Sequence, residues 1–175
     1  MEHRDHVRLI REGVRGGGRI WADLGSGEGA FTLALADLLG PTGSIYTVDR
    51  DSRALQVQVR ALRAAFPSVS VTPLVADFTK QLELPPLDGI VMANSLHFER
   101  DKLAVLRLVG AYLRPAGRLL LVEYDTDHGN RWVPFPLSFR AWATVADTAG
   151  FRETRLLASV PSRFLGSIYS ALSFR

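Results

Sequence analysis

Strand-like and helix-like runs alternate along the chain from residue 19 onward, and this alternation restricts the fold more than any other feature of the sequence. Short apolar runs of strand length, such as Arg19–Leu24 and Arg118–Glu123, are separated by longer segments whose apolar residues recur at helical spacing. Because helical crossovers are what parallel strands need, the pattern predicts an α/β fold, a doubly wound parallel sheet with helices on both faces.

The element boundaries follow from the same pattern. We expect helices at residues 7–14, 29–39, 51–65, 101–113 and 138–149, and strands at 19–24, 44–48, 69–75, 89–93 and 118–123. Either Asp51 or Ser52 can cap the third of these helices. The four residues before the last of these strands predict a turn, and residues 125–137 a long loop. Residues 151–160 and 164–173 alternate apolar and polar residues, which predicts a terminal antiparallel hairpin.

Length and composition indicate one globular domain over residues 1–175, with residues 1–18 as a short helix and a Gly-rich connector. The absence of cysteine excludes disulfides and thiolate chemistry and agrees with a cytoplasmic location. No apolar run approaches the roughly 20 residues that a membrane helix needs. The histidines show no metal-ligand spacing, so we expect no metal; they include His3, His6 and His128.

The charge balance gives little support for nucleic-acid binding. The formal net charge of +3 comes from 21 Lys and Arg against 18 Asp and Glu, spread along the chain. The densest basic stretch, Arg11–Arg19, has no aromatic residue before Trp21 on which a base would stack. A flexible connector is therefore the preferred interpretation of this stretch.

A glycine-rich segment, Asp23–Gly29, ends the first expected strand and opens the next helix. Glycines at this position let a ligand approach the backbone closely. Gly25, Gly27 and Ala30 satisfy a relaxed dinucleotide fingerprint, and Asp49 lies 20 residues after Gly29, as a ribose-binding acid does. This segment alone leaves both NAD and S-adenosylmethionine open as the ligand.

Asp23, two residues before the first glycine, favours S-adenosylmethionine over NAD as the ligand. The pattern Asp-x-Gly-x-Gly-x-Gly resembles the first motif of class I S-adenosylmethionine-dependent methyltransferases. In that family the acid and the loop surround the amino-acid portion of the cofactor. The resemblance therefore implies cofactor contacts for Asp23, Gly25, Ser26, Gly27 and Gly29.

Three further segments resemble family motifs, in order and one strand apart. Asp49 would accept from both ribose hydroxyls, and Arg50 would border the adenine. Asp77 would accept from the adenine amino group, and the Phe78 backbone N–H would meet a ring nitrogen. Asn94, within Ile90–Phe98, would face the sulfonium and the methyl acceptor.

The resemblance covers about residues 19–173, and Leu113–Arg118 looks like the family's turn before strand five. It implies a Rossmann-like seven-stranded sheet of order 3-2-1-4-5-7-6 with strand seven antiparallel. It also implies methyl transfer by in-line displacement, with S-adenosylhomocysteine as the product and no covalent enzyme intermediate.

Four residues are candidates for the acceptor side. His97 follows a strand, where it is either a hydrogen-bonded structural residue or a catalytic base. Tyr124 and Asp125, just past strand five, point toward the crevice at the carboxyl ends of the strands. Only about 18 residues precede the first strand, so we expect the loop with Trp132 to cover this side, the alternative being that its aromatics only pack the loop.

The acceptor class is predicted from the fourth motif. Asn94-Ser95-Leu96-His97 differs from the Asn/Asp-Pro-Pro-Tyr/Phe motif that clamps a flipped base, and it looks like the small-molecule group that includes quinone-biosynthesis methyltransferases. A small organic acceptor is expected, and RNA or protein is the alternative. A non-catalytic module that binds S-adenosylmethionine or NAD is an alternative of another class. We expect a monomer or a homodimer.

Overall fold

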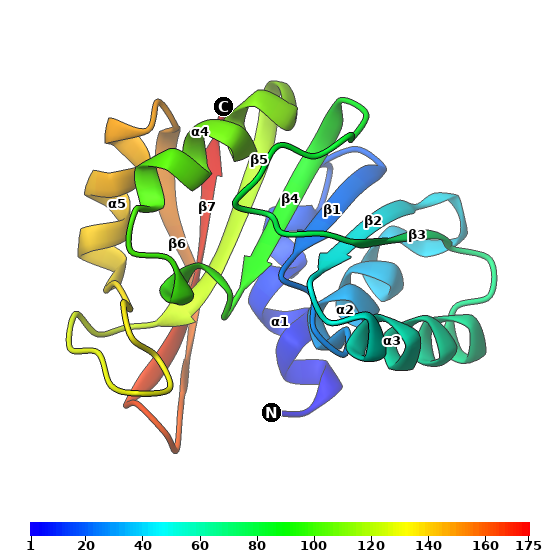
Figure 1. The fold of residues 1–175 in the computed structure, drawn as a ribbon, viewed down its shortest axis with the longest axis horizontal. Helices are drawn as coiled ribbons and strands as arrows, with labels where there is room; N and C mark the ends of the chain where they lie inside the picture. Colours follow the sequence, from blue (N-terminus) through cyan, green and yellow to red (C-terminus); the bar gives the residue numbers. More distant parts are fainter.

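The computed structural model describes residues 1–175 and contains one seven-stranded sheet with helices on both faces (Figure 1). The strand order is β3-β2-β1-β4-β5-β7-β6, and β7 runs antiparallel to both of its neighbours. The predicted fold class, strand order and antiparallel seventh strand are confirmed. The strands are β1 (Ile20–Leu24), β2 (Ser44–Asp49), β3 (Ser70–Val75), β4 (Leu87–Ala93), β5 (Leu113–Tyr124), β6 (Arg152–Pro161) and β7 (Ser167–Phe174).

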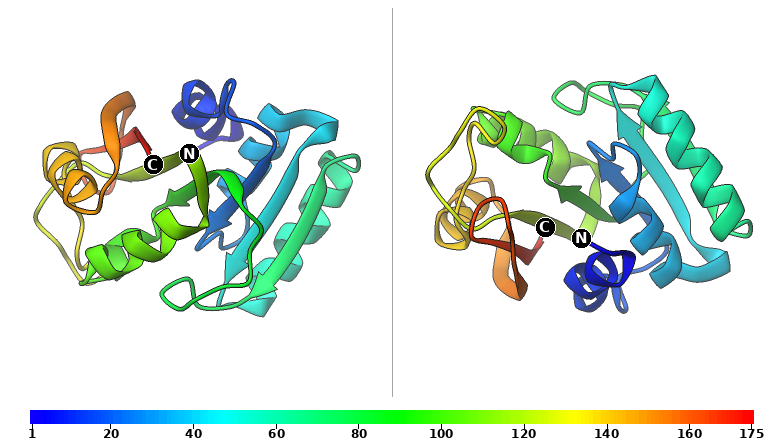
Figure 2. Two further views of the ribbon diagram at one scale, coloured as in Figure 1. Left: turned by 90° about the horizontal axis from the view of Figure 1, so that it is seen from above. Right: turned by 90° about the horizontal axis from the view of Figure 1, so that it is seen from below.

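The helices form two layers. They are α1 (His3–Val14), α2 (Ala30–Leu39), α3 (Ser52–Ala65), α4 (Lys102–Tyr112) and α5 (Phe139–Thr148), with short 3₁₀ turns η1 (Gly40–Thr42) and η2 (Leu96–Phe98). Helices α1, α2 and α3 cover one face of the sheet through buried residues such as Ile10, Leu35 and Leu62 (Figure 2). Helices α4 and α5 cover the other face through Leu106 and Trp142.

The central strands are buried on both faces, as β5 illustrates. Leu119 and Leu121 pack toward α4 and α5, whereas Leu120 and Val122 pack toward α1 and α2, and all four are 0% exposed. Successive strand residues point to opposite faces, so a continuous apolar run marks a strand covered on both sides. Each such side chain contributes about 1.5–3 kcal/mol by burial.

The start of α3 confirms the predicted cap. The Asp51 carboxylate accepts from the N–H groups of Arg53 and Ala54, at 2.8 and 3.3 Å. Asp51 therefore caps α3, and Asp49, two residues earlier at the end of β2, is not needed to cap this helix.

Strand β5 begins earlier than the sequence predicts, and this corrects the expected turn at residues 114–117. Leu113 is already paired with Leu87 of β4, and the next regular pair is Gly89 with Arg118, so extra residues bulge from β5 between the two pairs. Ala116 takes the left-handed conformation within this bulge, with φ +61°. Leu113 is 1% exposed, and its burial keeps the chain in the sheet.

Arg118 holds the connector between α1 and β1. Its guanidinium donates to the carbonyl oxygens of Gly13, Arg15 and Gly16 at 2.8, 2.7 and 3.1 Å. The segment that composition predicts as flexible is thus tied to the sheet by three hydrogen bonds.

The carboxyl ends of the parallel strands share one edge of the sheet with the first turn of α1 and the β6–β7 turn, at the lower side of Figure 1. In an open α/β sheet, ligands bind at this edge, where the order of the strands reverses. That reversal falls between β1 and β4. None of the helices has the length and apolar character needed to cross a membrane.

Candidate cofactor and acceptor site

The glycine-rich loop between β1 and α2 has three left-handed glycines, with φ of +77° at Gly25, +52° at Gly27 and +89° at Gly29. A side chain at Gly25 would collide with Ser95, and one at Gly29 would collide with Gln58. A side chain at Gly27 would meet no protein atom within 4 Å. The loop therefore packs closely at two glycines and leaves the space at the third free for a ligand.

Two buried polar atoms beside this loop lack a partner, the Ser26 Oγ and the Asn94 Oδ1. Asn94 directly follows β4 in the left-handed conformation, with φ +52°, and its N–H donates to the Val122 carbonyl at 2.8 Å. Buried polar groups nearly always have hydrogen-bond partners. These two atoms therefore fit a ligand with complementary polar groups, such as the amino-acid portion of S-adenosylmethionine.

Asp23 lies beneath the loop and is 1% exposed. Its carboxylate accepts from the Thr32 hydroxyl at 2.6 Å, and the Gln58 amide donates to the same hydroxyl oxygen at 2.9 Å. Burial raises the pKa of Asp23 to about 7, against the opposing effect of the Thr32 hydrogen bond. The observed role of Asp23 is to support the loop, and its contact with a cofactor stays a prediction.

Asp49 stands at the end of β2 beside the glycine loop. Its Oδ2 accepts from the Gly27 N–H at 2.8 Å, and its Oδ1 accepts from the Asp51 N–H at 2.9 Å. These bonds fix the plane of the carboxylate, and each oxygen keeps a lone pair for a further donor. The arrangement fits a pair of ribose hydroxyls.

The predicted adenine side is formed after β3. Asp77 accepts from the hydroxyl and N–H of Thr79 at 2.7 and 2.9 Å, and these bonds lower the pKa of its carboxyl group. The Arg50 guanidinium is 3.9 Å from Asp77. The Phe78 ring is 8% exposed and belongs to the core, while its backbone N–H donates to no protein group. That free N–H suits the predicted contact with an adenine nitrogen.

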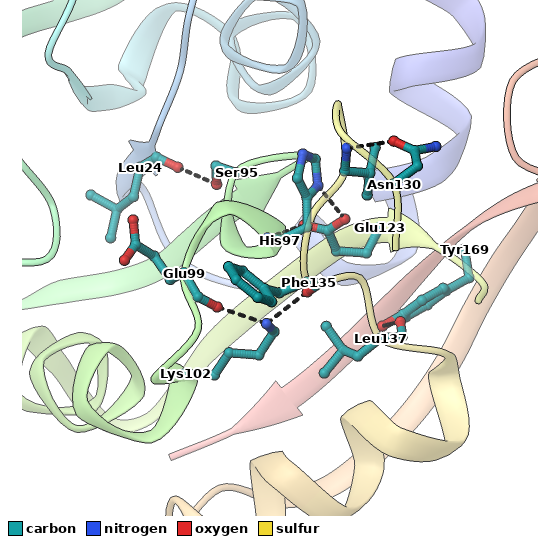
Figure 3. Close-up of polar contacts among 11 residues, drawn as sticks. Leu24, Ser95, His97, Glu99, Lys102, Glu123, Asn130, Phe135, Leu137 and Tyr169 are labelled. Atoms are coloured by element: carbon teal, nitrogen blue, oxygen red, sulfur yellow. Dashed lines mark hydrogen bonds and ion pairs between the residues drawn. The ribbon is translucent and has the colours of Figure 1, made fainter. Parts of the chain in front are cut away.

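His97, in the turn η2 that follows β4, and Glu123, near the end of β5, form a buried pair (Figure 3). The Glu123 side chain is 0% exposed and accepts twice from His97, from Nδ1 at 2.8 Å and from the backbone N–H at 3.1 Å. A carboxylate can only accept, so Nδ1 carries the proton and Nε2 is left as the free nitrogen. The Tyr124 ring lies beside the His97 ring, with 6.2 Å between centroids.

The loop at residues 125–137 is anchored at several points. Lys102 donates to the carbonyl oxygens of Glu99 and Phe135, at 2.8 and 2.7 Å, and so ties the loop to the start of α4 (Figure 3). Val133 and Leu137 are 3% and 4% exposed, and Leu137 belongs to the core between the sheet and helices α4 and α5.

Two residues of this loop that the sequence assigns to the acceptor side, Trp132 and Asp125, differ in their contacts. Trp132 is 68% exposed, with the Arg131 guanidinium 5.8 Å from its ring centroid, so it does not pack the loop. The Asp125 carboxylate accepts from the Phe139 N–H at 2.9 Å and thereby joins the loop to α5. That either residue contacts an acceptor stays a prediction.

Comparison with known proteins decides the family. The family described as "Methyltransferase domain" matches residues 19–154, which include the glycine loop and the ends of β2, β3, β4 and β5. The chain belongs to this family. The predicted methyltransferase family is confirmed, and the seven-stranded sheet has the strand order that the resemblance to the class I S-adenosylmethionine-dependent enzymes implies.

The chain is also similar to a curated methyltransferase and to two methyltransferases of solved structure. The ubiquinone/menaquinone biosynthesis C-methyltransferase UbiE of Pseudomonas aeruginosa is 32% identical over 120 residues, which cover 67% of this chain and 46% of the relative. The chain thus spans about half the length of this relative. A methyltransferase from Aquifex aeolicus has a TM-score of 0.72 at 18% identity, covering 99% of this chain and 93% of that one. The Burkholderia thailandensis 1,6-didemethyltoxoflavin-N1-methyltransferase, crystallised with its substrate and S-adenosylhomocysteine, has a TM-score of 0.76 at 15% identity, covering 99% and 77%.

The sequence did not single out two groups of residues in this methyltransferase domain. One is Glu123, which the sequence places at the end of an apolar strand; the signal was an acid directly after the run Leu119–Val122. The other is the buried polar chain of Thr32 and Gln58 beneath Asp23, for which helix periodicity gives no warning.

Proposed function

We propose that this domain transfers the methyl group of S-adenosylmethionine to a small organic acceptor at the carboxyl edge of the sheet. One observation carries the proposal. The backbone at Gly27 borders open space, and two buried polar atoms beside it, Ser26 Oγ and Asn94 Oδ1, have no hydrogen-bond partner. We call this part of the site the cradle. A cradle of this kind costs stability unless a ligand fills it, because buried polar groups without partners are unfavourable.

Different residues would bind the different parts of the cofactor. Asp49 would hold the ribose, Asp77 and the Phe78 N–H the adenine with Arg50 at its border, and Ser26 and Asn94 the amino-acid portion. The cofactor supplies an electrophilic methyl group when bound. The protein supplies proximity and alignment, since holding two reactants in line removes most of the entropic cost of their encounter.

His97 would remove a proton from those acceptors that must lose one. Glu123 fixes the ring by accepting from Nδ1, and this leaves Nε2 as the basic nitrogen. Glu123 is thus a positioning residue for His97. A role as base requires the His97 proton to lie on Nδ1, which nitrogen-15 NMR of the wild type and of Glu123→Gln measures.

Small molecules are favoured over RNA and protein as acceptors by two observations. The fourth motif, Asn94–His97, lacks the two prolines of the base-clamping enzymes. The curated relative is named as a C-methyltransferase of ubiquinone and menaquinone biosynthesis, and one structural neighbour is named as a 1,6-didemethyltoxoflavin methyltransferase; both names point to small molecules. We also propose that residues 1–175 act as one domain, because α1 packs on the same face of the sheet as α2.

The test is to incubate the protein with S-adenosylmethionine carrying a labelled methyl group and a cell extract separated by size. We expect label in the small-molecule fraction only, with none when Asp49→Ala is used. Label confined to RNA or protein would overturn the small-molecule acceptor, and labelling by the Asp49→Ala protein at the wild-type rate would overturn the assigned cofactor site.

A further inference from the structure

We infer that the open cavity between α1 and the β6–β7 turn is the acceptor subsite, and that it takes a planar aromatic acceptor bearing a negatively charged group. The inference rests on the proposed function and names the substrate class of that same site. The cavity has a volume of about 730 Å³, within the range of small-molecule sites. Its lining comes from the first turns of α1, the end of β5 and the β6–β7 turn.

The cavity lies next to the methyl-transfer site through two contacts. Tyr124 lines the cavity, and its ring neighbours that of His97 on the other side. From α1, the His6 ring contacts Phe31 in the first turn of α2, directly after the glycine loop, with 4.8 Å between centroids. Tyr124, the neighbour of the candidate base, thus lines the cavity directly, and α1, which lines its other side, packs against the helix that follows the cofactor loop.

Aromatic side chains give the cavity its shape preference. Tyr124 and Phe164 meet edge to face with 5.9 Å between centroids, and both line the cavity. Phe164 is 50% exposed, so its ring is available to a ligand. The Tyr124 hydroxyl is protonated at neutral pH, as phenols ordinarily are, and can donate; burial, with Glu123 nearby, raises its pKa further. Two rings at this angle favour a flat, apolar ligand body with a polar group near the tyrosine.

The charges of the cavity favour an anion. Its two carboxylates are engaged, since Glu2 pairs with Arg4 at 3.1 Å and Asp5 accepts from the Glu2 N–H at 3.0 Å. Arg8 and Arg163 line the cavity from opposite sides, and neither forms an ion pair. Unpaired guanidinium groups bind carboxylates strongly and bidentately.

The experiment measures probe binding in the presence of saturating S-adenosylhomocysteine. Salicylate is compared with salicylamide, which has nearly the same shape but no carboxylate, by calorimetry and ligand-observed NMR at millimolar concentration. We expect salicylate to bind more tightly, and Arg8→Gln and Arg163→Gln each to weaken it by about tenfold. Arg107→Gln on α4 is the matched control, because Arg107 is exposed and far from this cavity.

Each outcome decides the inference. Equal binding of the two probes, no salicylate binding, or salicylate binding unaffected by both arginine variants would overturn it. Retained S-adenosylhomocysteine binding in those same samples would leave the proposed function standing. Failure of wild-type protein to bind S-adenosylhomocysteine would instead overturn the proposed function.

Discussion

Replacing Asp23 by Asn tests the electrostatics of the cofactor loop. The Asp23 carboxyl is buried, and its pKa rises from 3.8 to about 7 on folding. A carboxyl group with a higher pKa in the folded state binds its proton more tightly there, so the folded protein loses stability as pH rises through this range. The whole rise corresponds to about 4 kcal/mol, of which about 3 kcal/mol falls between roughly pH 5 and roughly pH 8.

The Asp23→Asn protein keeps the shape of the protonated side chain and cannot ionise. We therefore expect its free energy of unfolding, relative to wild type, to increase by about 3 kcal/mol from roughly pH 5 to roughly pH 8. Urea denaturation followed by circular dichroism over this pH range measures the difference. Asp147→Asn is the control, because Asp147 is exposed on α5, and its curve should run parallel to wild type. A parallel curve for Asp23→Asn as well would refute the reasoning.

Three further predictions concern the glycine loop, the His97–Glu123 pair and the long loop. Gly27→Ala should abolish tight S-adenosylhomocysteine binding by filling the cradle, whereas Gly150→Ala, also at a positive φ with no neighbour within 4 Å, should leave calorimetric affinity unchanged. Nitrogen-15 NMR should find the His97 proton on Nδ1 in wild type and a mixture of tautomers in Glu123→Gln, with cofactor affinity unchanged; a wild-type proton on Nε2 alone would contradict the pairing. Trp132→Ala should cost under about 1 kcal/mol of stability in urea denaturation, because the side chain is 68% exposed, whereas the fully buried Trp142→Ala should cost about 3–5 kcal/mol.

The sheet and the cofactor edge were predictable because both depend on local patterns. Continuous apolar runs such as Leu119–Val122 identify strands buried on two faces, and their alternation with helices orders the sheet. The glycines of the first loop stand at fixed spacing, which the left-handed conformations of Gly25, Gly27 and Gly29 explain.

The remaining features depend on contacts between distant residues, which local patterns do not contain. Glu123 pairs with a histidine 26 residues away, and Arg118 reaches carbonyl groups more than 100 residues away. The bulge at the start of β5 exists because Leu113 stays buried against its neighbours while the chain still has to reach the Gly89–Arg118 pair. Local sequence there favours a turn, and tertiary packing overrides it.

The most direct test of the central claim is calorimetric titration of the protein with S-adenosylhomocysteine and, separately, with NAD. We expect one molecule of S-adenosylhomocysteine to bind per chain and Asp49→Ala to weaken it strongly, because charge-assisted hydrogen bonds to the ribose contribute about 1.5–3 kcal/mol each. NAD should give no binding heat. Binding of NAD without binding of S-adenosylhomocysteine would contradict the account.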